Sequence, residues 1–546
     1  MACVIITNIF KRNSFKKLGH FWYARSLSVA ATRLKHDREW KAVIGIEIHA
    51  QIYSKSKLFS GSGTEYAYPV NNQVGLFDAA IPGTLPVINK RCVEAAVMTA
   101  LALNCSVNKV SKFDRKHYFY ADLPAGYQIT QQRQPIATDG YCRCIVYNPA
   151  VPKYREPREL SVRIIQLQLE QDSGKSLHDE ENGYTLVDLN RAGVGLMEIV
   201  TAPDMCDGEE AASLIKELQL IFKTIGTCNA RMDEGSLRVD ANISVHRPGE
   251  PLGVRTEVKN LNSVRFVAKA IDYEISRQIE LLEDGGKVEN ETKAFDFKTG
   301  RTVSMRDKEM KQDYRFMPEP NLPPLRIYDS SDAVSHLDAH QVINVDDIRA
   351  SIPTLPAAKR THLVDVCGLP WADAIKLSSE VNLMEYFEGI LRDAPHRLPK
   401  TAATILLKHV LRCVYKAKCS IADCNLAPQR VGEICDLIDT SKITWDIGAK
   451  LVDMVFEGET LNPAAIVEKN KWHKITDNEV ILRLCQTAID ENPKAVRKYK
   501  EGKKRYFSTL IHHVQNKTEQ CTDSFVVMDT LKQLVLCEYS KVTQES

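Results

Sequence analysis

Acidic, imidazole and amide side chains alternate with apolar ones in residues 43–52, a spacing that could build a catalytic or metal-binding surface. Glu47, His49 and Gln51 would share one side of an extended chain. The opposite side would carry Ile44, Ile46, Ile48 and Ile52. A period of two over this length predicts a half-buried β-strand. Because many antiparallel strands expose a polar face that has no chemical role, a site is indicated only if the pattern recurs.

Three later segments, 162–172, 237–246 and 254–259, repeat the alternation. Their polar faces would present Gln166, Gln168, Glu170, Asp172, Arg238, Asp240, Asn242, Glu257 and Lys259. In the first of them we expect Ile165, Leu167 and Leu169 on the apolar face. Glu198 stands between Met197 and Ile199, where a carboxylate is costly to bury without a partner.

Carboxylates gathered on one face of a sheet would repel one another unless a cation neutralised them. Oxygen-rich surroundings favour Mg²⁺, which usually arrives with substrate phosphates. The 15 cysteines include no Cys-x-x-Cys pair, so we expect no structural zinc. The polar face therefore predicts a magnesium and phosphate site.

The segments that would position these side chains predict one largely antiparallel sheet covered by helices. Helical spacing from 207 to 225, with Asp207 as N-cap and Gly226 as stop, predicts a helix on the apolar face. Residues 95–103 predict a second, shorter helix. The fold class expected is α+β, with a cradle-like sheet domain over residues 40–330.

The pattern of apolar and polar residues changes after the proline-rich stretch that ends at Pro324. From about Asp346 the spacing is helical, and we expect a helical domain over 343–425 and a helical tail domain over 426–546. Residues 492–505 are strongly basic, which fits either a solvated face or contact with an RNA backbone. Residues 112–120 interleave basic and aromatic side chains, a pattern that can contact a nucleotide or RNA, although aromatic side chains more often pack.

The chain of 546 residues has a formal net charge of +2, so its global charge does not indicate a nucleic-acid partner. Residues 1–36 contain no Asp or Glu and are rich in basic and hydroxylated residues, as in a mitochondrial transit peptide. We therefore expect a location in the mitochondrial matrix. Because no apolar run reaches the roughly 18–20 residues that span a bilayer, membrane insertion is not expected.

Several long motifs resemble the GatB family of tRNA amidotransferase subunits, and they follow the order of that family. They lie at 43–49, 113–116, 122–129, 190–193, 198–201, 240–242 and 257–263. The similarity runs from about Trp40 to the C-terminus and is densest before Leu325. It implies a cradle domain, a helical domain and a tail domain that grips tRNA.

The resemblance also implies a reaction. Members of this family use ATP and Mg²⁺ to phosphorylate the side-chain carboxylate of Glu misattached to tRNA(Gln), and ammonia then displaces phosphate to give Gln-tRNA(Gln). The ammonia would come from glutamine in a GatA-like amidase subunit, and a GatC-like small subunit would join the two. The expected protein is thus a carbon–nitrogen ligase within a three-subunit complex.

By motif match, the catalytic residues implied are Glu47, His49, Glu170 and Glu198. The same four residues and Glu257 are the implied metal ligands. Arg238, Asp240 and Lys259 are implied to bind the nucleotide cofactor, with Arg238 or Lys259 steadying the charge of its phosphates. Many relatives carry paired zinc cysteines in the loop that here runs from 61 to 75; this chain has none there, and no zinc is expected.

An alternative is a scaffold subunit that binds tRNA and does no chemistry; the basic run at 492–505 would fit it as well. A free-standing ligase is disfavoured because the sequence lacks a Gly-Gly-Ser-Ser amidase run and shows no cysteine in a recognisable nucleophile setting. ATP hydrolysis stimulated by Glu-tRNA(Gln) would separate the catalytic hypothesis from the scaffold hypothesis.

Overall fold

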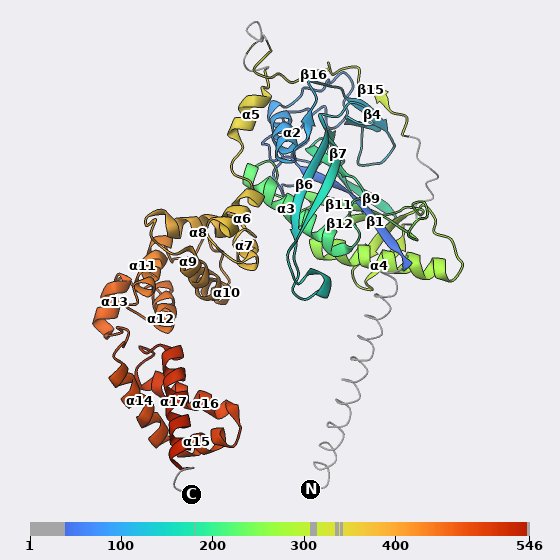
Figure 1. Cartoon of the computed structure of the whole chain (residues 1–546). Coiled ribbons are helices and arrows are strands. Elements are labelled where there is room, and N and C mark those ends of the chain that lie inside the picture. Colours follow the sequence, from blue (N-terminus) through green and yellow to red (C-terminus); the bar gives the residue numbers. More distant parts are fainter. Residues whose placement is uncertain (1–38, 180, 306–313, 333–337, 339–341, 543–546) are drawn as a thin grey trace, which may run out of the picture. The chain divides into compact units, whose positions relative to one another are not determined.

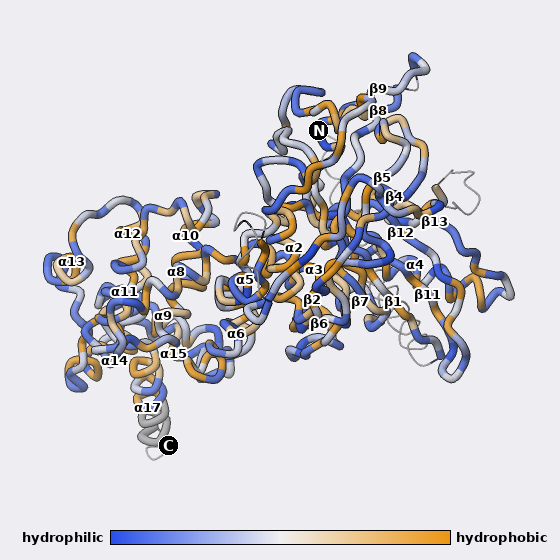
Figure 2. Tube along the Cα trace, turned by 90° about the horizontal axis from the view of Figure 1, so that it is seen from above, coloured by the Kyte–Doolittle hydropathy of each residue, from blue (hydrophilic) through white to orange (hydrophobic). Residues whose placement is uncertain are grey.

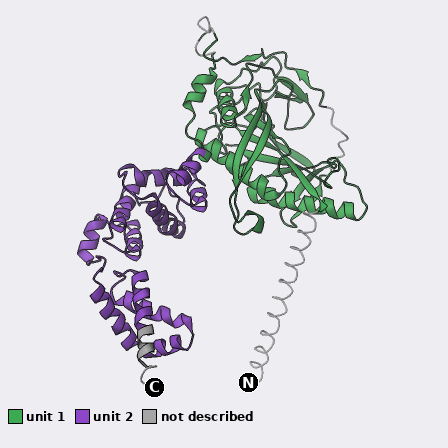
Figure 3. Cartoon of the chain, in the orientation of Figure 1, with its two compact units in different colours: residues 1–357 green, residues 358–546 purple. Residues whose placement is uncertain are grey.

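The structure is a computed structural model that describes residues 39–179, 181–305, 314–332, 338 and 342–542 (Figure 1). The expected transit peptide, 1–36, lies outside the described residues. The chain divides into two compact units, residues 1–357 and residues 358–546 (Figure 3). No described helix is both long enough and apolar enough to cross a membrane.

A mixed, largely antiparallel sheet is the frame of the first unit. Among the described residues it has nine strands in the order β14-β13-β12-β11-β1-β10-β7-β6-β2, and only β12 and β13 run parallel. The strands are β1 (Lys41–Gln51), β2 (Ser106–Val107), β6 (Ala137–Val146), β7 (Arg158–Gln171), β10 (Gly195–Thr201), β11 (Leu237–His246), β12 (Thr256–Leu261), β13 (Thr292–Asp296) and β14 (Arg301–Ser304). The opening strand predicted from the sequence is thus central in the sheet.

Smaller pieces of sheet flank this frame. They are β3 (Val110–Ser111) with β16 (Leu325–Arg326), β4 (Asp114–His117) with β5 (Tyr127–Thr130) and β15 (Met317–Pro318), and β8 (Lys175–Asp179) with β9 (Tyr184–Asp188). A short 3₁₀ turn covers Pro152–Tyr154. The β4–β5 hairpin matters most for the site, because β5 packs against β7.

Helices bury the apolar face of the sheet. They are α2 (Lys90–Ala102), α3 (Gly208–Ile225) and α4 (Val264–Glu283). As expected, the Asp207 side chain caps α3 by accepting hydrogen bonds from the backbone N–H groups of Glu209 and Glu210, and Gly226, with φ 66°, ends it. The hydrophobic stretches of α2 and α3 gather against the strands (Figure 2), where they share one core with Ile44, Ile46 and Ile48.

One predicted face is wrong. Ile165 was expected in the core beside Leu167, but it is 49% exposed, whereas Ile164 is 1% exposed. The cause is a bulge: Gln166 pairs with Val200, but Ile164, not Ile165, pairs with Thr201. The extra residue reverses the alternation at this point in β7, so the polar face is continuous only from Gln166 onwards.

Helix α5 (Val345–Ser351) packs its Val345 and Ile348 against the core of the first unit. The remaining helices are α6 (Pro356–Asp365), α7 (Trp371–Leu377), α8 (Val381–Arg392), α9 (Pro399–Ile405), α10 (Leu411–Ala417), α11 (Pro428–Asp439), α12 (Trp445–Phe456), α13 (Pro463–Asn470), α14 (Asn478–Glu491), α15 (Pro493–Lys500), α16 (Phe507–Lys517) and α17 (Ser524–Val542). A π-helical turn at Leu406–Val410 joins α9 to α10, and a 3₁₀ turn at Lys504–Tyr506 precedes α16.

The helices of the second unit share two hydrophobic clusters. One contains apolar side chains between Leu363 and Val467 together with Cys521, and the other contains side chains between Ile481 and Val535. The α+β class expected from the sequence is confirmed. The finer division at 343–425 and 426–546 stays a prediction.

Candidate functional site

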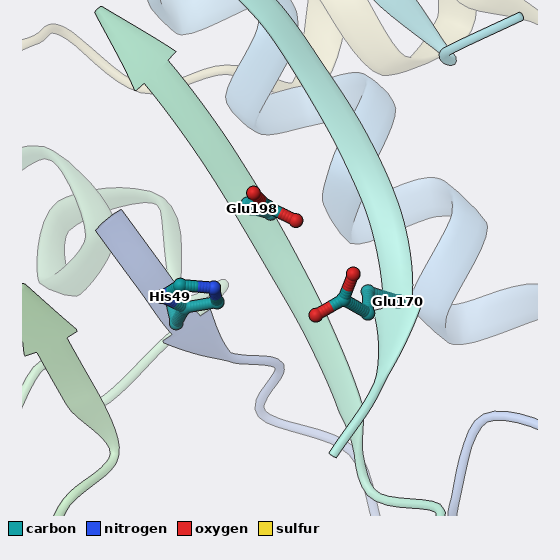
Figure 4. Close-up of side chains that lie close together, drawn as sticks. All are labelled: His49, Glu170 and Glu198. Atoms are coloured by element: carbon teal, nitrogen blue, oxygen red, sulfur yellow. The ribbon is translucent and has the colours of Figure 1, made fainter. Parts of the chain in front are cut away.

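Three side chains from neighbouring central strands converge on the polar face of the sheet. His49 on β1 lies directly opposite Glu198 on β10, and Glu170 on β7 pairs with Leu196, two residues before Glu198. Each of the three offers one nitrogen or oxygen atom, and these atoms all lie within 4.8 Å of one another. Figure 4 shows the imidazole and both carboxylates directed toward the same space. The sequence had placed these residues together, and the register of the strands explains how.

Burial gives this cluster unusual acid–base properties. Glu170 is 3% exposed, and its Oε2 atom has no hydrogen-bond partner among the described residues. Burial, with a smaller contribution from the Glu198 charge, raises the pKa of Glu170 to about 7. Burial also raises the pKa of Glu198. Two carboxylates held this close in a dry setting are stabilised in the charged state only when a cation joins them.

Gln168 positions one of the carboxylates. Its side chain is fully buried, and its Nε2 donates a hydrogen bond of 2.7 Å to Glu198 Oε2 and another of 3.1 Å to Thr130 Oγ1. Gln166 Nε2 donates in turn to Gln168 Oε1 at 2.7 Å. The row Gln166–Gln168–Glu198 therefore positions the Glu198 carboxylate through hydrogen bonds that the two glutamines donate.

Lys116 on β4 completes the cluster, and the sequence analysis had not singled it out. Burial alone would lower its pKa, but the charges of Glu170 and Glu198 raise the pKa of this ammonium group overall. Its Nζ also lies 4.9 Å from the ring centre of Tyr314. The sequence signals were the basic and aromatic run at 112–120 and the family motif at 113–116, and neither indicates that a separate hairpin brings Lys116 to the acidic face.

Glu47 lies beside the cluster, two residues before His49 on β1. It pairs with Asp240 on β11 and with Val200 on β10, and Asn242 Nδ2 donates to its Oε1 at 3.0 Å. The charge of Glu47 contributes, after burial, to the raised pKa of Glu198. The residue is thus within electrostatic reach of the cluster, although its oxygens fall outside the 4.8 Å group.

Arg238 lies opposite His49 on the other side of β1. Its Nη2 donates to Asp172 Oδ2 at 2.8 Å, and Arg191 Nε lies 3.5 Å from the same oxygen. Burial alone would lower the pKa of Arg238, but the Asp172 carboxylate raises it overall. The Nη2 atom of this guanidinium is therefore anchored on Asp172, and its Nε is a buried donor without a hydrogen-bond partner among the described residues.

The remaining predicted residues lie further across the face. Lys259 Nζ is 3.6 Å from Glu257 Oε1, and Thr292 Oγ1 donates to Glu257 Oε2 at 3.2 Å. Asp240 Oδ1 accepts a hydrogen bond from the backbone N–H of Asn260 at 3.1 Å. The structure therefore does not bring Glu257 into the group that contains His49, Glu170 and Glu198.

The donor set of the cluster fits a divalent cation. The two carboxylates are ligands of the type that Mg²⁺ and Mn²⁺ prefer, the imidazole is a ligand more typical of transition metals, and the Oε2 of Glu170 is a ligand atom that no hydrogen bond occupies among the described residues. A second group of possible ligands, Cys206, Asp207 and Glu210, differs because Lys153 and Arg158 already neutralise its carboxylates. The first group is thus the better candidate for a cation.

A buried ion pair holds the loop after β1. Lys57 is fully buried, and its Nζ lies 3.3 Å from Asp78 Oδ2, which also accepts hydrogen bonds from Ser60 Oγ at 2.8 Å and from the backbone N–H of Gly75 at 2.9 Å. Gly193, with φ 83°, passes so close that a Cβ there would sit 2.4 Å from Asp78 Oδ1. The motif at 190–193 thus has a packing role beside the strands that carry the site.

The basic run at 492–505 forms α15 and the turn after it. Ala495 and Val496 are buried, and Tyr499 stacks on Phe507 with ring centres 4.7 Å apart. The exposed basic side chains are Lys494, Arg497, Lys500, Lys503, Lys504 and Arg505. The run is therefore an ordered, exposed basic face anchored in the core of the second unit.

Comparisons with known proteins match both units. Residues 42–332 match the family model described as the GatB/GatE catalytic domain, and residues 385–535 match the one described as the GatB domain. The chain is 49% identical over 507 residues to the B subunit of mitochondrial glutamyl-tRNA(Gln) amidotransferase from Homo sapiens, covering 93% of this chain and 90% of that protein. It is 45% identical over 518 residues to the Drosophila melanogaster protein of the same name, covering 94% and 99%. It is 42% identical over 494 residues to the B subunit of aspartyl/glutamyl-tRNA(Asn/Gln) amidotransferase from Rickettsia prowazekii, covering 90% and 97%.

Proposed function

The chain belongs to the GatB/GatE family, and on this premise we propose that it is the carboxylate-activating subunit of a mitochondrial glutamyl-tRNA(Gln) amidotransferase. In the proposed reaction, the γ-carboxylate of Glu attached to tRNA(Gln) attacks the γ-phosphorus of ATP, and ADP leaves. Ammonia then attacks the activated carbonyl carbon, phosphate leaves, and Gln-tRNA(Gln) is formed. The observation that carries this proposal is the convergence of His49, Glu170 and Glu198 beside the Lys116 ammonium.

Anionic and cationic side chains have separate roles in the proposed reaction, and the anionic ones would bind the metal ion. His49, Glu170 and Glu198 would hold Mg²⁺, and Glu47 would add negative charge beside them. When bound, Mg²⁺ supplies charge neutralisation for the nucleotide phosphates and aligns them with the attacking oxygen. Without it, the carboxylates of the cluster would repel a phosphate, so nucleotide binding should depend on the metal.

Cationic side chains would hold the anionic substrates. Lys116 lies within electrostatic reach of the carboxylates of the cluster, and the Nε donor of Arg238 has no hydrogen-bond partner among the described residues. Burial alone would lower the pKa of Lys259, but the charges of Glu257 and Asp240 raise it overall, and the charge of Lys116 opposes them. We assign the transferred phosphate to the side of the cluster that carries Lys116, Arg238 and Lys259. Asp240 lies beside these cations as a hydrogen-bond acceptor.

The other subunits would supply ammonia. The relatives are named as B subunits, which supports a complex with further subunits. We propose a GatA-like amidase that releases ammonia from glutamine and a GatC-like small subunit that joins the two chains. Residues 1–36 and the mitochondrial relatives support a location in the matrix.

The exposed basic face of α15 is proposed to contact tRNA. Contacts of Lys and Arg with phosphates weaken steeply as salt rises. This face would serve a non-catalytic scaffold equally well, which keeps that alternative open until the acidic cluster is tested.

The test is ATP-dependent conversion of Glu-tRNA(Gln) to Gln-tRNA(Gln) by the complex assembled with its partner subunits. We expect His49→Ala and Glu198→Gln each to lower the rate at least about 100-fold, because each removes a group that holds the charge the transition state needs. Glu159→Gln is the matched control, since Glu159 lies on the same strand as Glu170 but is exposed and pairs only with Arg143 among the described residues. Full activity in both site variants would refute the assignment of the site, and a complex in which Glu-tRNA(Gln) stimulates no ATP hydrolysis would establish the scaffold instead.

A further inference from the structure

An exposed aromatic turn stands next to the acidic cluster and has no part in the function proposed above. It is the connection 118–126 between β4 and β5. Phe119 is 87% exposed and Tyr120 is 44% exposed. An exposed aromatic ring beside a polar site offers a flat apolar face on which a planar ligand can stack.

The turn is fixed in place and is not a loose loop. The backbone N–H of Tyr118 donates to Gly126 O at 3.1 Å, and Ser176 Oγ donates to Asp122 Oδ2 at 3.0 Å, tying the turn to β8. The Phe119 ring lies so close to Gly126 that a Cβ there would sit 2.9 Å from its Cε1. The backbone of Gly126 therefore packs against one edge of the Phe119 ring and leaves its remaining surface open to a ligand.

The turn continues directly from the site. Lys116, whose ammonium interacts electrostatically with the cluster, is three residues before Phe119, a separation of at most about 10 Å along an extended chain. Tyr118 lies between them, and burial together with the charges of Glu170 and Asp172 raises its pKa overall, against the opposing charge of Lys116. Its ring centre lies 5.7 Å from that of Tyr120 and 6.1 Å from that of Tyr314. A row of aromatic rings thus leads from the acidic cluster to solvent.

We propose that Phe119 and Tyr120 form a stacking platform for an adenine base whose reacting group lies at the acidic cluster. The inference rests on the proposed function, which brings two adenines to this site: the base of ATP and the 3′-terminal adenosine to which the amino acid is esterified. Both have the same chemistry, a purine joined to an anionic or ester-linked group. Because the platform and Lys116 are separated by about the length of one nucleoside, the platform suits either source of the adenine base.

Stacking explains features that simple packing does not. A packed ring would be covered, as Phe113 is at 3% exposure, whereas Phe119 is almost fully accessible. Base stacking on an aromatic ring contributes about 1–3 kcal/mol per base, or roughly 5- to 150-fold in affinity. Positive charge close to the turn would attract the phosphates that accompany the base: Lys112 lies just before the hairpin, and His117 ends β4.

The experiment uses two fluorescent probes with the full chain in the presence of Mg²⁺. One is a non-hydrolysable ATP analogue with 2-aminopurine in place of adenine, and the other is tRNA(Gln) with 2-aminopurine at its 3′ end. Stacking quenches 2-aminopurine, so we expect strong quenching of one probe and weak quenching of the other, which identifies the source of the base. In Phe119→Ala the quenching should be lost and the affinity for that probe should fall about 10-fold, while Phe119→Trp should retain both.

Phe297→Ala is the control, because Phe297 is 65% exposed but belongs to the turn between β13 and β14, where it stacks on Phe266. This variant should behave as the unmodified chain. Two results would overturn the inference: binding of both probes without quenching, or the same quenching in Phe119→Ala as in the unmodified chain. Neither involves turnover, so a failure of stacking leaves the proposed function standing, and a failure of amidation leaves the quenching result interpretable.

Discussion

Replacing Glu170 by glutamine should stabilise the metal-free protein while abolishing its activity. Glu170 is buried, its Oε2 has no hydrogen-bond partner among the described residues, and its pKa in the folded chain is about 7, raised from 4.5. A pKa raised by folding means that the folded state binds the proton more tightly than the unfolded chain does. The stability from this protonated group is fully present below the unfolded pKa and is lost as pH rises through the folded pKa.

The magnitude follows from the size of the shift. At about 1.4 kcal/mol per pKa unit, the rise from 4.5 to about 7 costs the wild-type fold roughly 3 kcal/mol above pH 7, and almost nothing near pH 4. A neutral glutamine side chain at this position does not titrate, so the Glu170→Gln variant escapes this loss. Lys116 keeps Glu198 as a counter-charge in the variant, so the substitution does not leave a buried ammonium alone.

The assay is thermal unfolding of the full chain with EDTA between pH 5 and pH 8. We expect the transition temperature of the first unit to be higher in Glu170→Gln than in the wild type. The difference should grow as pH increases and reach roughly 5 °C at pH 8. Mg²⁺ should reduce this difference in transition temperature by stabilising the wild type and not the variant, because a ligand that binds only the folded state raises its stability.

Glu274→Gln is the matched control. Glu274 is also fully buried, but Arg277 Nε, Gln278 Nε2 and Thr302 Oγ1 donate hydrogen bonds to its carboxylate. Burial alone would raise the pKa of Glu274, but these partners lower it overall, so its stabilising effect is present above the unfolded pKa and is lost as pH falls through the folded value. The Glu274→Gln variant should be less stable at pH 8. If Glu170→Gln is also less stable than wild type at pH 8 in EDTA, the reasoning about the cluster is refuted.

Three further substitutions test the packing and electrostatics around the cluster. Gly193→Ala should lower the free energy of unfolding by about 3 kcal/mol in chemical denaturation, since it combines strain at φ 83° with a Cβ 2.4 Å from Asp78 Oδ1. Lys57→Met should cost about 3–5 kcal/mol in the same measurement, because it leaves a buried Asp78 carboxylate without its cation. Gln168→Leu should move the acidic limb of the pH–rate profile to higher pH, because the lost hydrogen bond had favoured the charged form of Glu198 and its removal raises the pKa.

Each of these has a control within the chain. Gly183→Ala has a similar φ of 71° but no atom within 4 Å of the added Cβ, so it should cost less than Gly193→Ala. Adding Asp78→Asn to Lys57→Met should recover part of the loss. A pH–rate profile of Gln168→Leu that superimposes on that of the wild type would show that the hydrogen bond does not tune Glu198.

The parts of the site that the sequence predicted depend on alternation along single strands. Glu47, His49, Glu170, Asp240 and their apolar partners fall on the faces expected, because side chains alternate strictly in a regular strand. Ile165 breaks the expectation because a bulge is a property of the pairing between two strands, and the sequence of one strand does not contain it.

Other parts of the site depend on contacts between segments that are distant in the sequence, and these contacts could not be predicted. The distance between Glu257 and the cluster depends on how many strands separate β12 from β10, which only the strand order decides. Lys116 reaches the acidic face because the β4–β5 hairpin packs on β7, and the basic and aromatic composition of that hairpin alone was equally consistent with ordinary packing. The side chains that join the site through tertiary contacts are therefore the ones that sequence reasoning missed.

The central claim is that His49, Glu170 and Glu198 together hold a divalent cation for the nucleotide. The most direct measurement is electron paramagnetic resonance of Mn²⁺ titrated into the full chain with a non-hydrolysable ATP analogue. The account predicts one tightly bound Mn²⁺ per chain with a nitrogen coupling that disappears in His49→Ala, and loss of the bound ion in the Glu170→Gln, Glu198→Gln double variant. Equal Mn²⁺ binding in the wild type and the double variant, with no nitrogen coupling in either, would contradict it.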